Sequence, residues 1–589
     1  MSLVLGIASS HDASACVFRD GKLVSAISEE RLSRLKCDGN RMPQDAIDAV
    51  LAEAGATRRD VTHIALLHAS YPEHYFKRHS AVKEAERMLS RAVRKLKGKE
   101  QRQVWVDNLL KILAANNESI DGYFRRDVFL QEERFSPNTV VKFYDHHETH
   151  AVLAAFYSGF DSAAVITIDG VGDLNIHHTS SIYRDGTLTR KYVSTAPDPR
   201  DHQSGTSAGM VYFHITQLLG FMPLRHEGKV LGLAAYGDPT ALAAGFDRAL
   251  RLAPSGHTFD SDFANVPSPE DAKSAYLKTL IDGHSRENVA AATQAVFERT
   301  IVGLIRNFLV ETGLRNVAAN GGAFANVKLN QRIAALPEVD SLYVYPAMSD
   351  TGNSVGAALL MLDQIEPGFV GRNAHRMVDV YDGPAPQSAD IRAEATRLGL
   401  KFEEVDEATL VARAAERMHA GQVVGWFQGR MEFGPRALGN RSMVAAPTDR
   451  SINKWLNERL ERTEFMPFAP SVLAEYADDI FDNVAKSRHT AEFMTITYDV
   501  KASWRARIPA VVHVDSTARP QLVRKDRNPR YWLLIDRYRQ LSGIPLVLNT
   551  SFNVHEEPIV CLPKEGLKAL ADRRVDCLAI GDFWVERAT

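Results

Sequence analysis

The 589-residue chain has only four cysteines, Cys16, Cys37, Cys561 and Cys577, and none of them forms a Cys-x-x-Cys pair. This argues against a disulfide framework or a zinc finger, and it fits a reducing cytosol. The chain also lacks an apolar run long enough to cross a membrane, and its first residues lack the basic segment of a signal peptide. We therefore expect a soluble, cytoplasmic protein with no membrane partner.

The chain also lacks an excess of positive or negative side chains. The 70 lysines and arginines nearly balance the 73 aspartates and glutamates, which leaves a net charge of -3. Dedicated nucleic-acid binders need a basic excess, so the composition argues against a nucleic-acid partner. What the chain does have is 45% hydrophobic residues, enough at this length for two or three domains. The composition leaves the oligomeric state open, a homo-oligomer included.

Four side chains far apart in the sequence are candidate metal ligands. His146 and His150 are four residues apart behind Asp145, a good helix N-cap, so they should share one helix face. Asp169 follows an apolar run typical of a buried strand, and Asp350 lies in a polar turn. Two nitrogens and two carboxylates suit a divalent transition ion. A His-x-x-x-His pair alone is weak evidence and also fits ordinary helix-surface histidines.

Two parts of the chain resemble each other. The segment 3–31 has a strand, a polar loop and a hairpin turning at Asp20-Gly21, and residues 163–194 repeat this pattern with a turn at Asp185-Gly186. Asp-Gly dipeptides favour tight hairpin turns. The repetition suggests an actin-like architecture in which two halves clamp a nucleotide, with chance similarity of two hairpins as the alternative.

Three turns rich in small residues precede predicted helices, in 227–238, 320–330 and 351–360. Such turns let backbone amides approach phosphates closely, although each one alone also fits a tight packing turn. The basic stretch between Lys77 and Arg102 is interpreted as a solvated helix face rather than a binding patch.

Near residues 365–385 the pattern of strands and helices gives way to glycine, proline and polar residues, and a new alternation of strand and helix follows. This change predicts a domain boundary. The following domain contains the segment QGRMEFGPRALGNRS, in which Arg430, Arg436 and Arg441 suit an anion site, with solvated surface arginines as the alternative. Further along, Arg519 and the polar residues of LVLNTSFNVHEEPIV add to this site, although Asn553 also fits the cap of a turn.

With SSHDASA, DHHETHA, ITIDG, EGKVLGLAAYG, NGGAFAN, GPRALGNRS, ARPQ and NTSFN in this order, the chain resembles the NodU/CmcH family of O-carbamoyltransferases, whose members modify nodulation factors, cephamycins and aminoglycosides. The resemblance implies an α/β fold. It comprises a duplicated actin-like (ASKHA) N-terminal domain over residues 1–370 and a YrdC-like α/β C-terminal domain over residues 385–565. It also implies that residues 566–589 pack back on the first domain.

The resemblance further implies an ATP-dependent reaction. Carbamoyl phosphate and ATP, with Mg²⁺, form carbamoyl adenylate in the second domain, and a small hydroxylated acceptor such as a sugar or natural product takes the carbamoyl group in the first. The metal would be Fe(II) or another divalent transition ion on His146, His150, Asp169 and Asp350, and His11 would be the general base. The other implied catalytic residues are Arg436, Arg441, Arg462 and Arg519. The implied nucleotide- and donor-binding residues are Lys229, Gly321, Gly322, Asn326, Gly352, Asn549, Asn553 and His555.

This chain departs from the family pattern in the second domain. Leu460 and Met466 stand where a lysine and an arginine are usual, and His555 stands for the arginine of Asn-x-Arg-Gly-Glu-Pro. Losing several charge-assisted contacts would impair adenylation unless Arg459, Arg441 or Lys454 substitutes.

Two alternatives therefore stay open. One is a tRNA threonylcarbamoylation-type enzyme, which shares both domain types, and the other is a nucleotide-binding protein with a degenerate second domain. Hydrogenase-maturation carbamoyltransferases carry cysteine-rich zinc modules, which four scattered cysteines exclude.

Overall fold

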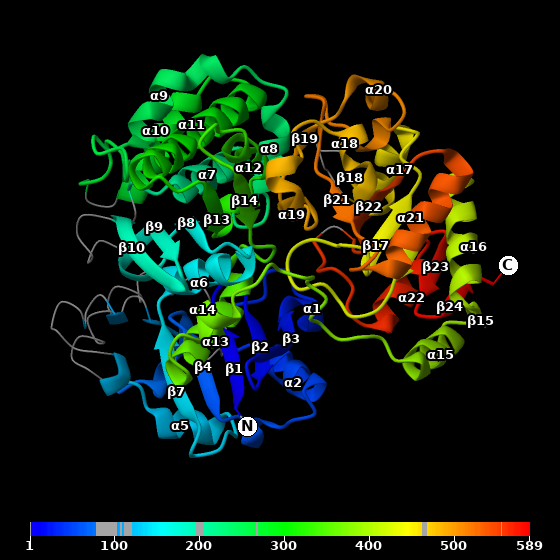
Figure 1. The fold of residues 1–589 in the computed structure, drawn as a ribbon, viewed down its shortest axis with the longest axis horizontal. Helices are drawn as coiled ribbons and strands as arrows, with labels where there is room; N and C mark the ends of the chain where they lie inside the picture. Colours follow the sequence, from blue (N-terminus) through cyan, green and yellow to red (C-terminus); the bar gives the residue numbers. More distant parts are fainter. Residues whose placement is uncertain are drawn as a thin grey trace.

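The computed structural model describes residues 2–77, 103–106, 109, 110, 113, 120–195, 205–266, 269–461, 468–554 and 556–588 (Figure 1). Within these ranges, two five-stranded sheets and one eight-stranded sheet with their helices make up most of the molecule. The basic stretch predicted as a solvated helix face lies outside the described residues from position 78 to 102. No helix in the described ranges combines the length and apolar character needed to cross a membrane.

The first sheet has the order β3-β2-β1-β4-β7. Its strands are β1 (Leu3–Ala8), β2 (Ser14–Arg19), β3 (Lys22–Ser28), β4 (His63–Leu67) and β7 (Val140–Tyr144). The first three strands are antiparallel neighbours, whereas β4 is parallel to β1 and β7 is parallel to β4. Asp20 and Gly21 turn β2 into β3 with φ of 48° and 78°, the positive angles that tight hairpins need.

The second sheet repeats this order as β10-β9-β8-β13-β14. Its strands are β8 (Ser162–Ile168), β9 (Ile176–Arg184), β10 (Thr187–Thr195), β13 (Asn316–Asn320) and β14 (Ser341–Val344). Asp185 and Gly186 form the corresponding hairpin turn, with φ of 49° and 79°. Each sheet thus has three antiparallel strands followed by two parallel ones. The duplication predicted from the two hairpins is confirmed, and the N-terminal part has the expected actin-like fold.

Two helices, α6 (His146–Ser158) and α13 (Asn353–Ile365), lie between the two sheets (Figure 1). Helix α6 packs on β8 and β13, α13 packs on β1 and β4, and the two helices pack on each other. A Cβ atom at Gly356 would overlap the backbone carbonyl of Thr149, so glycine is required where α13 meets α6. This close contact fixes the start of α6 relative to both sheets.

The other helices of this part surround the sheets. They are α1 (Glu30–Ser33), α2 (Gln44–Glu53), α5 (Arg126–Glu132), α7 (Ala208–Leu218), α8 (Glu227–Ala234), α9 (Ala243–Ala249), α10 (Pro269–Ile281), α11 (Arg286–Thr312), α12 (Val327–Ala334) and α14 (Phe369–Asn373). Two short strand pairs join β5 (Ser70–Pro72) to β6 (Gln103–Trp105) and β11 (Arg251–Leu252) to β12 (Phe259–Asp260). Helices α7 to α11 gather beyond the second sheet (Figure 1).

Helix α10 buries a lysine. Lys273 is 1% exposed, and its Nζ has no hydrogen-bond partner among the described residues. Burial lowers the pKa of Lys273 to about 7. Between this value and the unfolded pKa of about 10.4, the unfolded chain binds one proton more than the folded chain, so this residue makes stability rise with pH in that window.

We therefore expect Lys273→Met to stabilise the protein at pH 7, by an amount on the order of 4 kcal/mol. The gain should shrink as the pH is raised toward 10, because the wild-type lysine then no longer has to lose a proton on folding. Thermal unfolding midpoints of the wild type and of Lys273→Met between pH 7 and pH 10 test this prediction. Lys278→Met is the control, because Lys278 is exposed on the same helix. A midpoint difference that does not change with pH would contradict this account.

The eight-stranded sheet has the order β15-β24-β23-β16-β17-β22-β18-β21. Its strands are β15 (Lys401–Glu404), β16 (Val424–Phe427), β17 (Arg441–Ala445), β18 (Ala469–Leu473), β21 (Gln521–Val523), β22 (Leu546–Ser551), β23 (Cys577–Ile580) and β24 (Phe583–Glu586), with β19 (Tyr498–Asp499) and β20 (Thr517–Ala518) paired separately. The helices are α15 (Ser388–Arg397), α16 (Glu407–His419), α17 (Ser451–Arg459), α18 (Ala477–Ile480), α19 (Arg488–Ala491), α20 (Ala502–Arg505), α21 (Pro529–Ser542) and α22 (Pro563–Ala571).

The last strands belong to this sheet. β23 pairs in parallel with β16 and in antiparallel with β24, which pairs with β15. The prediction that residues 566–589 return to the first domain is therefore wrong. The segment Cys577–Ile580 is apolar and fully buried between two strands, so its backbone groups are satisfied inside the sheet.

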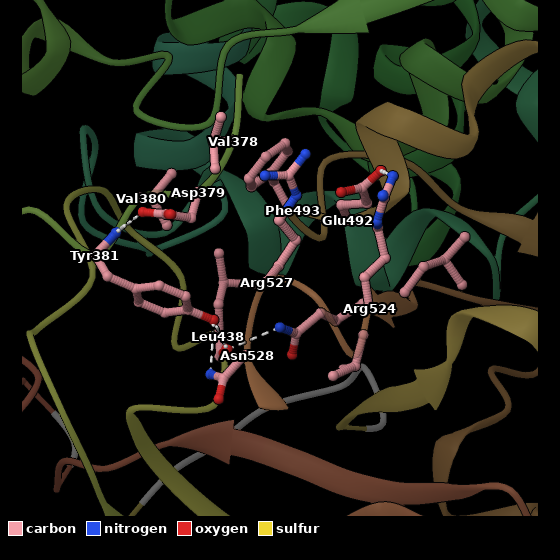
Figure 2. Close-up of a pocket in the computed structure, with 13 residues that line it drawn as sticks. Val378, Asp379, Val380, Tyr381, Leu438, Glu492, Phe493, Arg524, Arg527 and Asn528 are labelled. Atoms are coloured by element: carbon pink, nitrogen blue, oxygen red, sulfur yellow. Dashed lines mark hydrogen bonds and ion pairs between the residues drawn. The ribbon is translucent and has the colours of Figure 1, made fainter. Parts of the chain in front are cut away.

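The connection between the two parts is hydrogen-bonded to the C-terminal part. In Figure 2, Tyr381 of this connection lies against Asn528, whose Nδ2 donates to Tyr381 Oη at 2.9 Å, while Tyr381 Oη donates to the backbone oxygen of Leu438 at 2.9 Å. The small cavity beside them, about 30 Å³, has room for roughly one water molecule. It is too small for a substrate.

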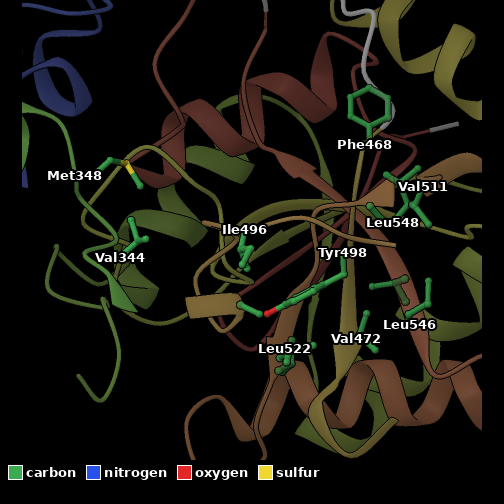
Figure 3. Packing of buried hydrophobic residues seen from close by; sticks show 14 of the residues in the cluster. Val344, Met348, Phe468, Val472, Ile496, Tyr498, Val511, Leu522, Leu546 and Leu548 are labelled. Carbon is green, nitrogen blue, oxygen red and sulfur yellow. The ribbon is translucent and has the colours of Figure 1, made fainter. Parts of the chain in front are cut away.

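One hydrophobic cluster runs through both parts. Val344, the last residue of β14, and Met348 belong to the same buried cluster as Ile496, Tyr498 and Leu522 of β21 (Figure 3). All five side chains are buried. Because apolar contact here is continuous, the eight-stranded sheet is packed firmly onto the actin-like part.

Candidate active site

Four side chains from three segments meet at the start of α6. One donor atom from each of His146, His150, Asp169 and Asp350 lies within 4.8 Å of every other. His146 Nε2 is 3.4 Å from Asp169 Oδ2 and 3.5 Å from Asp350 Oδ1. His150 Nε2 is 3.2 Å and 3.7 Å from the same two atoms. The structure thus brings together all four residues that the sequence predicted as metal ligands.

The local structure explains how each ligand is positioned. The side chain of Asp145 accepts a hydrogen bond from Glu148 N at 2.8 Å and begins α6, so the two histidines lie one turn apart on one face. Asp169 follows the buried end of β8, and its Oδ1 accepts from Gly170 N at 2.7 Å. Asp350 begins the 3-10 turn that leads into α13.

The donor set fits a divalent transition ion. Donor atoms bound at about 2.0–2.2 Å to one ion lie roughly 3.0 to 3.6 Å apart, which is close to the distances observed here. In the part of the chain that the structure describes, no lysine or arginine pairs with Asp169 or Asp350. The group therefore has the charge of two carboxylates and lacks a permanent cation.

His11 lies beside this group, in the loop between β1 and β2. Its Nδ1 is 3.3 Å from Asp350 Oδ2 and its Nε2 is 3.6 Å from Asp12 Oδ2. Burial alone would lower the pKa of His11, but the carboxylates of Asp12 and Asp350 raise it to about 10. Burial of His146 is likewise outweighed by Asp350 and Asp169, which raise its pKa to about 10. Negative charge therefore dominates this site.

A cavity of about 470 Å³ opens on this site, and we call it the first cavity. His11, Asp169 and Asp350 lie in its wall, as do residues of α7 and α8. Segments of the C-terminal part close it, among them Arg436 and Asn553. Its volume is that of a typical small-molecule site.

A second cavity, of about 300 Å³, lies between α8 and the eight-stranded sheet. Its wall has one carboxylate among the described residues, Glu556. Its lysines and arginines are Lys36, Arg225, Lys229, Arg436 and Arg519. Such a wall favours a ligand with several negative charges, such as a phosphate chain. Lys36, Arg225, Arg436 and Asn553 line both cavities, so the two cavities adjoin.

The predicted nucleotide-holding residues divide into two groups. Gly322 and Asn326 line the first cavity. Gly321 and Gly352 are in neither wall, and a Cβ atom at either would overlap a backbone carbonyl, so they are tight packing turns. Lys229, predicted alongside these turns, is buried and lines the second cavity instead.

The site residues predicted in the second domain do not all lie in one cavity wall. Arg436, Arg519, Asn549 and Asn553 line the second cavity. Arg441 does not, because its guanidinium is fully buried and donates to the backbone oxygens of Gln428, Gly429, Asn440 and Pro384. Arg441 was predicted to contact an anion, but in the structure its guanidinium holds the loop between Gln428 and Asn440. Arg462 and His555 lie outside the described residues, as does Met466.

The suggested replacements for the missing cations do not reach the cavities. Arg459 stacks on Trp455 and lies 3.0 Å from Asp576, and Lys454 is exposed beside Glu458. Neither residue is in the wall of the first or second cavity. The cations of the second cavity come partly from the actin-like part, through Lys229 and its neighbours.

Sequence reasoning missed several residues of these walls. Asp12 follows His11 directly, so its position in SSHDASA was a signal. Arg225 and His226 precede the EGKVLGL segment, and Glu556 stands where the family pattern has glycine. No local pattern marked Lys36, because its place in both walls depends on how distant segments meet.

Comparisons with known proteins identify the family of the chain. The family model "Carbamoyltransferase N-terminus" matches residues 3–359 and "Carbamoyltransferase C-terminus" matches residues 415–587. The nodulation protein NolNO of Sinorhizobium fredii is 31% identical over 98% of this chain and 79% of its own length. The nodulation protein NolO of Bradyrhizobium diazoefficiens is 33% identical over 75% of this chain and 79% of its own length.

Among solved structures, HypF of T. kodakarensis is similar with a TM-score of 0.33 and 11% identity, over 64% of this chain and 50% of that one. The sequence matches decide the family, because they cover both the actin-like part and the eight-stranded sheet. On this ground the chain belongs to the NodU/CmcH family of carbamoyltransferases, and it is an enzyme of that family.

Proposed function

We propose that the enzyme transfers a carbamoyl group from carbamoyl phosphate to a hydroxyl of a small metabolite, with ATP as co-substrate and carbamoyl adenylate as intermediate. The observation that carries the proposal is the pair of adjoining cavities. One has a basic wall suited to phosphates, and the other has His11 beside a group of two histidines and two aspartates.

The second cavity is proposed to form the intermediate. Water would hydrolyse carbamoyl phosphate to carbamate and phosphate. A carbamate oxygen would then attack the α-phosphorus of ATP, and pyrophosphate would leave. Lys229, Arg436 and Arg519 would bind the phosphate chain, with Mg²⁺ accompanying ATP. Asn549 Nδ2 donates to Ser471 Oγ at 3.0 Å, which fixes the polar floor of this cavity.

The intermediate would then pass between the cavities inside the protein. Arg436 and Asn553 line both walls, so a phosphate can keep a partner throughout the passage. Asn553 accepts from Ser551 Oγ at 2.6 Å and donates to Glu557 O at 2.7 Å, which holds its loop in place. Internal passage would protect the reactive adenylate from bulk water.

The first cavity is proposed to carry out the transfer. His11 would take the proton of the acceptor hydroxyl as its oxygen attacks the carbamoyl carbon, and AMP would leave. His146, His150, Asp169 and Asp350 would hold Fe(II) or a similar ion, which when bound supplies a Lewis acid for the negative charge of the reacting groups. Such a cation would also offset the charge of Asp350 and Asp169, which together with Asp12 raise the pKa of His11.

The test is pyrophosphate release from ATP by the full chain, with Mg²⁺ and Fe(II), with and without carbamoyl phosphate, and without acceptor. Release that requires carbamoyl phosphate is the expected result. Nucleotide binding without any release would favour the alternative of a nucleotide-binding protein with a degenerate second domain.

A variant at Arg519 tests whether ATP binds in the second cavity. We expect Arg519→Ala to weaken ATP binding by roughly tenfold to a hundredfold, because a charge-assisted contact to phosphate contributes about 1.5 to 3 kcal/mol. Calorimetric titration with a non-hydrolysable ATP analogue measures it. Arg537→Ala is the control, because Arg537 lies on α21 and lines neither cavity. Equal affinities for both variants would place the nucleotide elsewhere.

A further inference from the structure

Glu556 is held against the cations of the second cavity. His226 Nε2 donates to Glu556 Oε1 at 2.8 Å, and Arg225 Nη1 is 3.5 Å from Glu556 Oε2. Arg225 also donates to the backbone oxygen of Lys36 at 2.7 Å. Arg225, which lines both cavities, therefore connects this carboxylate of the second cavity to the segment at Lys36.

The backbone at Glu556 is unusual. Its φ of 61° is left-handed, a conformation that costs a residue with a Cβ atom about 1 to 2 kcal/mol and that glycine adopts freely. Such a residue persists where its side chain compensates for the strain. The contacts to His226 and Arg225 help to offset this cost and hold the carboxylate in the wall of the second cavity.

We propose that Glu556 is a built-in competitor for the anionic ligand of the second cavity and thereby sets the affinity of that cavity for phosphate groups. The inference rests on the proposed function, because it takes the ligand to be a phosphate chain. Arg225 and His226 are cavity groups that an entering phosphate can use, and Glu556 already occupies them. Ligand binding thus exchanges one anion for another.

This exchange makes the cavity selective. A pyrophosphate or triphosphate group brings enough negative charge to displace one carboxylate from Arg225, whereas a single phosphate gains less from the same contact. The Glu556 side chain is 34% exposed and His226 is 14% exposed, so the carboxylate has solvent on one side into which it can turn. After the reaction, its return to Arg225 would favour release of the phosphate products.

The test compares pyrophosphate binding to the full-chain wild type and to Glu556→Gln by titration calorimetry. Glutamine keeps the shape and removes the charge, so we expect it to bind pyrophosphate about fivefold to tenfold tighter. The gain should fall as salt is raised, because screening weakens the repulsion that is removed.

Glu461→Gln is a matched control. Glu461 also has a positive φ, 55°, and also pairs with an arginine, Arg574 at 2.7 Å, but it lines neither cavity. It should bind pyrophosphate as the wild type does. Pyrophosphate binding that is equal or weaker in Glu556→Gln than in the wild type would overturn the inference.

The same titrations separate this inference from the proposed function. If Arg519→Ala weakens pyrophosphate binding but Glu556→Gln does not strengthen it, the cavity binds phosphates and only the competitor role fails. If neither the wild type nor Glu556→Gln binds pyrophosphate, both fail together.

Discussion

Replacing Asp169 with asparagine is expected to abolish metal binding and to lower carbamoyl transfer by about a thousandfold or more. Asparagine keeps the size of the side chain but removes one of the two carboxylates that face both histidines. A Lewis acid contributes several kcal/mol to such a reaction, which corresponds to this factor. Metal content and carbamoylated product, measured on the same preparation, report the two losses.

Pyrophosphate release should persist in this variant, because none of the four proposed metal ligands lines the second cavity. Asp161→Asn is the control, since Asp161 is exposed just before the opposite end of β8. Full transfer activity in a metal-free Asp169→Asn protein would refute the proposed role of the four residues.

The second large effect is expected at His11. His11→Ala should reduce acceptor-dependent transfer by about 10² to 10⁴, the usual contribution of a general base. His11 lies in the wall of the first cavity, and its Nδ1 is 3.3 Å from Oδ2 of the proposed metal ligand Asp350. The acceptor hydroxyl is proposed to meet the adenylate there. Rates of acceptor carbamoylation and of pyrophosphate release, measured separately, should show that only the first falls.

Metal content is the additional measurement for His11→Ala, because a loss of metal would explain the same fall in rate without a base. The exposed His284→Ala serves as control for the loss of a histidine. If His11→Ala transfers the group at the wild-type rate, another group must take the proton.

Much of this site could be predicted because the signals are local. The N-cap at Asp145 fixes where α6 begins, and helix geometry then places His146 and His150 on one face. The Asp-Gly turns of both hairpins likewise depend on two adjacent residues each. Where a rule connects neighbours in sequence, the prediction and the structure agree.

The rest depends on contacts between distant segments, which no local pattern contains. Arg441 resembled an anion-binding arginine, yet its guanidinium is enclosed by carbonyls of its own loop and of Pro384. Lys229 was predicted with the turns of the actin-like part, but the direction of α8 takes it to the other cavity. The apolar strand at Cys577–Ile580 could pair with any buried strand, and its choice of β16 follows from the whole sheet.

The mixed origin of the second cavity has a consequence for engineering and for evolution. Because Lys229 on α8 and Arg519 near β20 face one space, a hybrid that joins the N-terminal part of one relative to the C-terminal part of another inherits two halves of a binding site that were selected with different neighbours. Recombination between relatives should therefore succeed when α8 travels with the eight-stranded sheet. Cuts that separate them should give folded proteins with poor donor use.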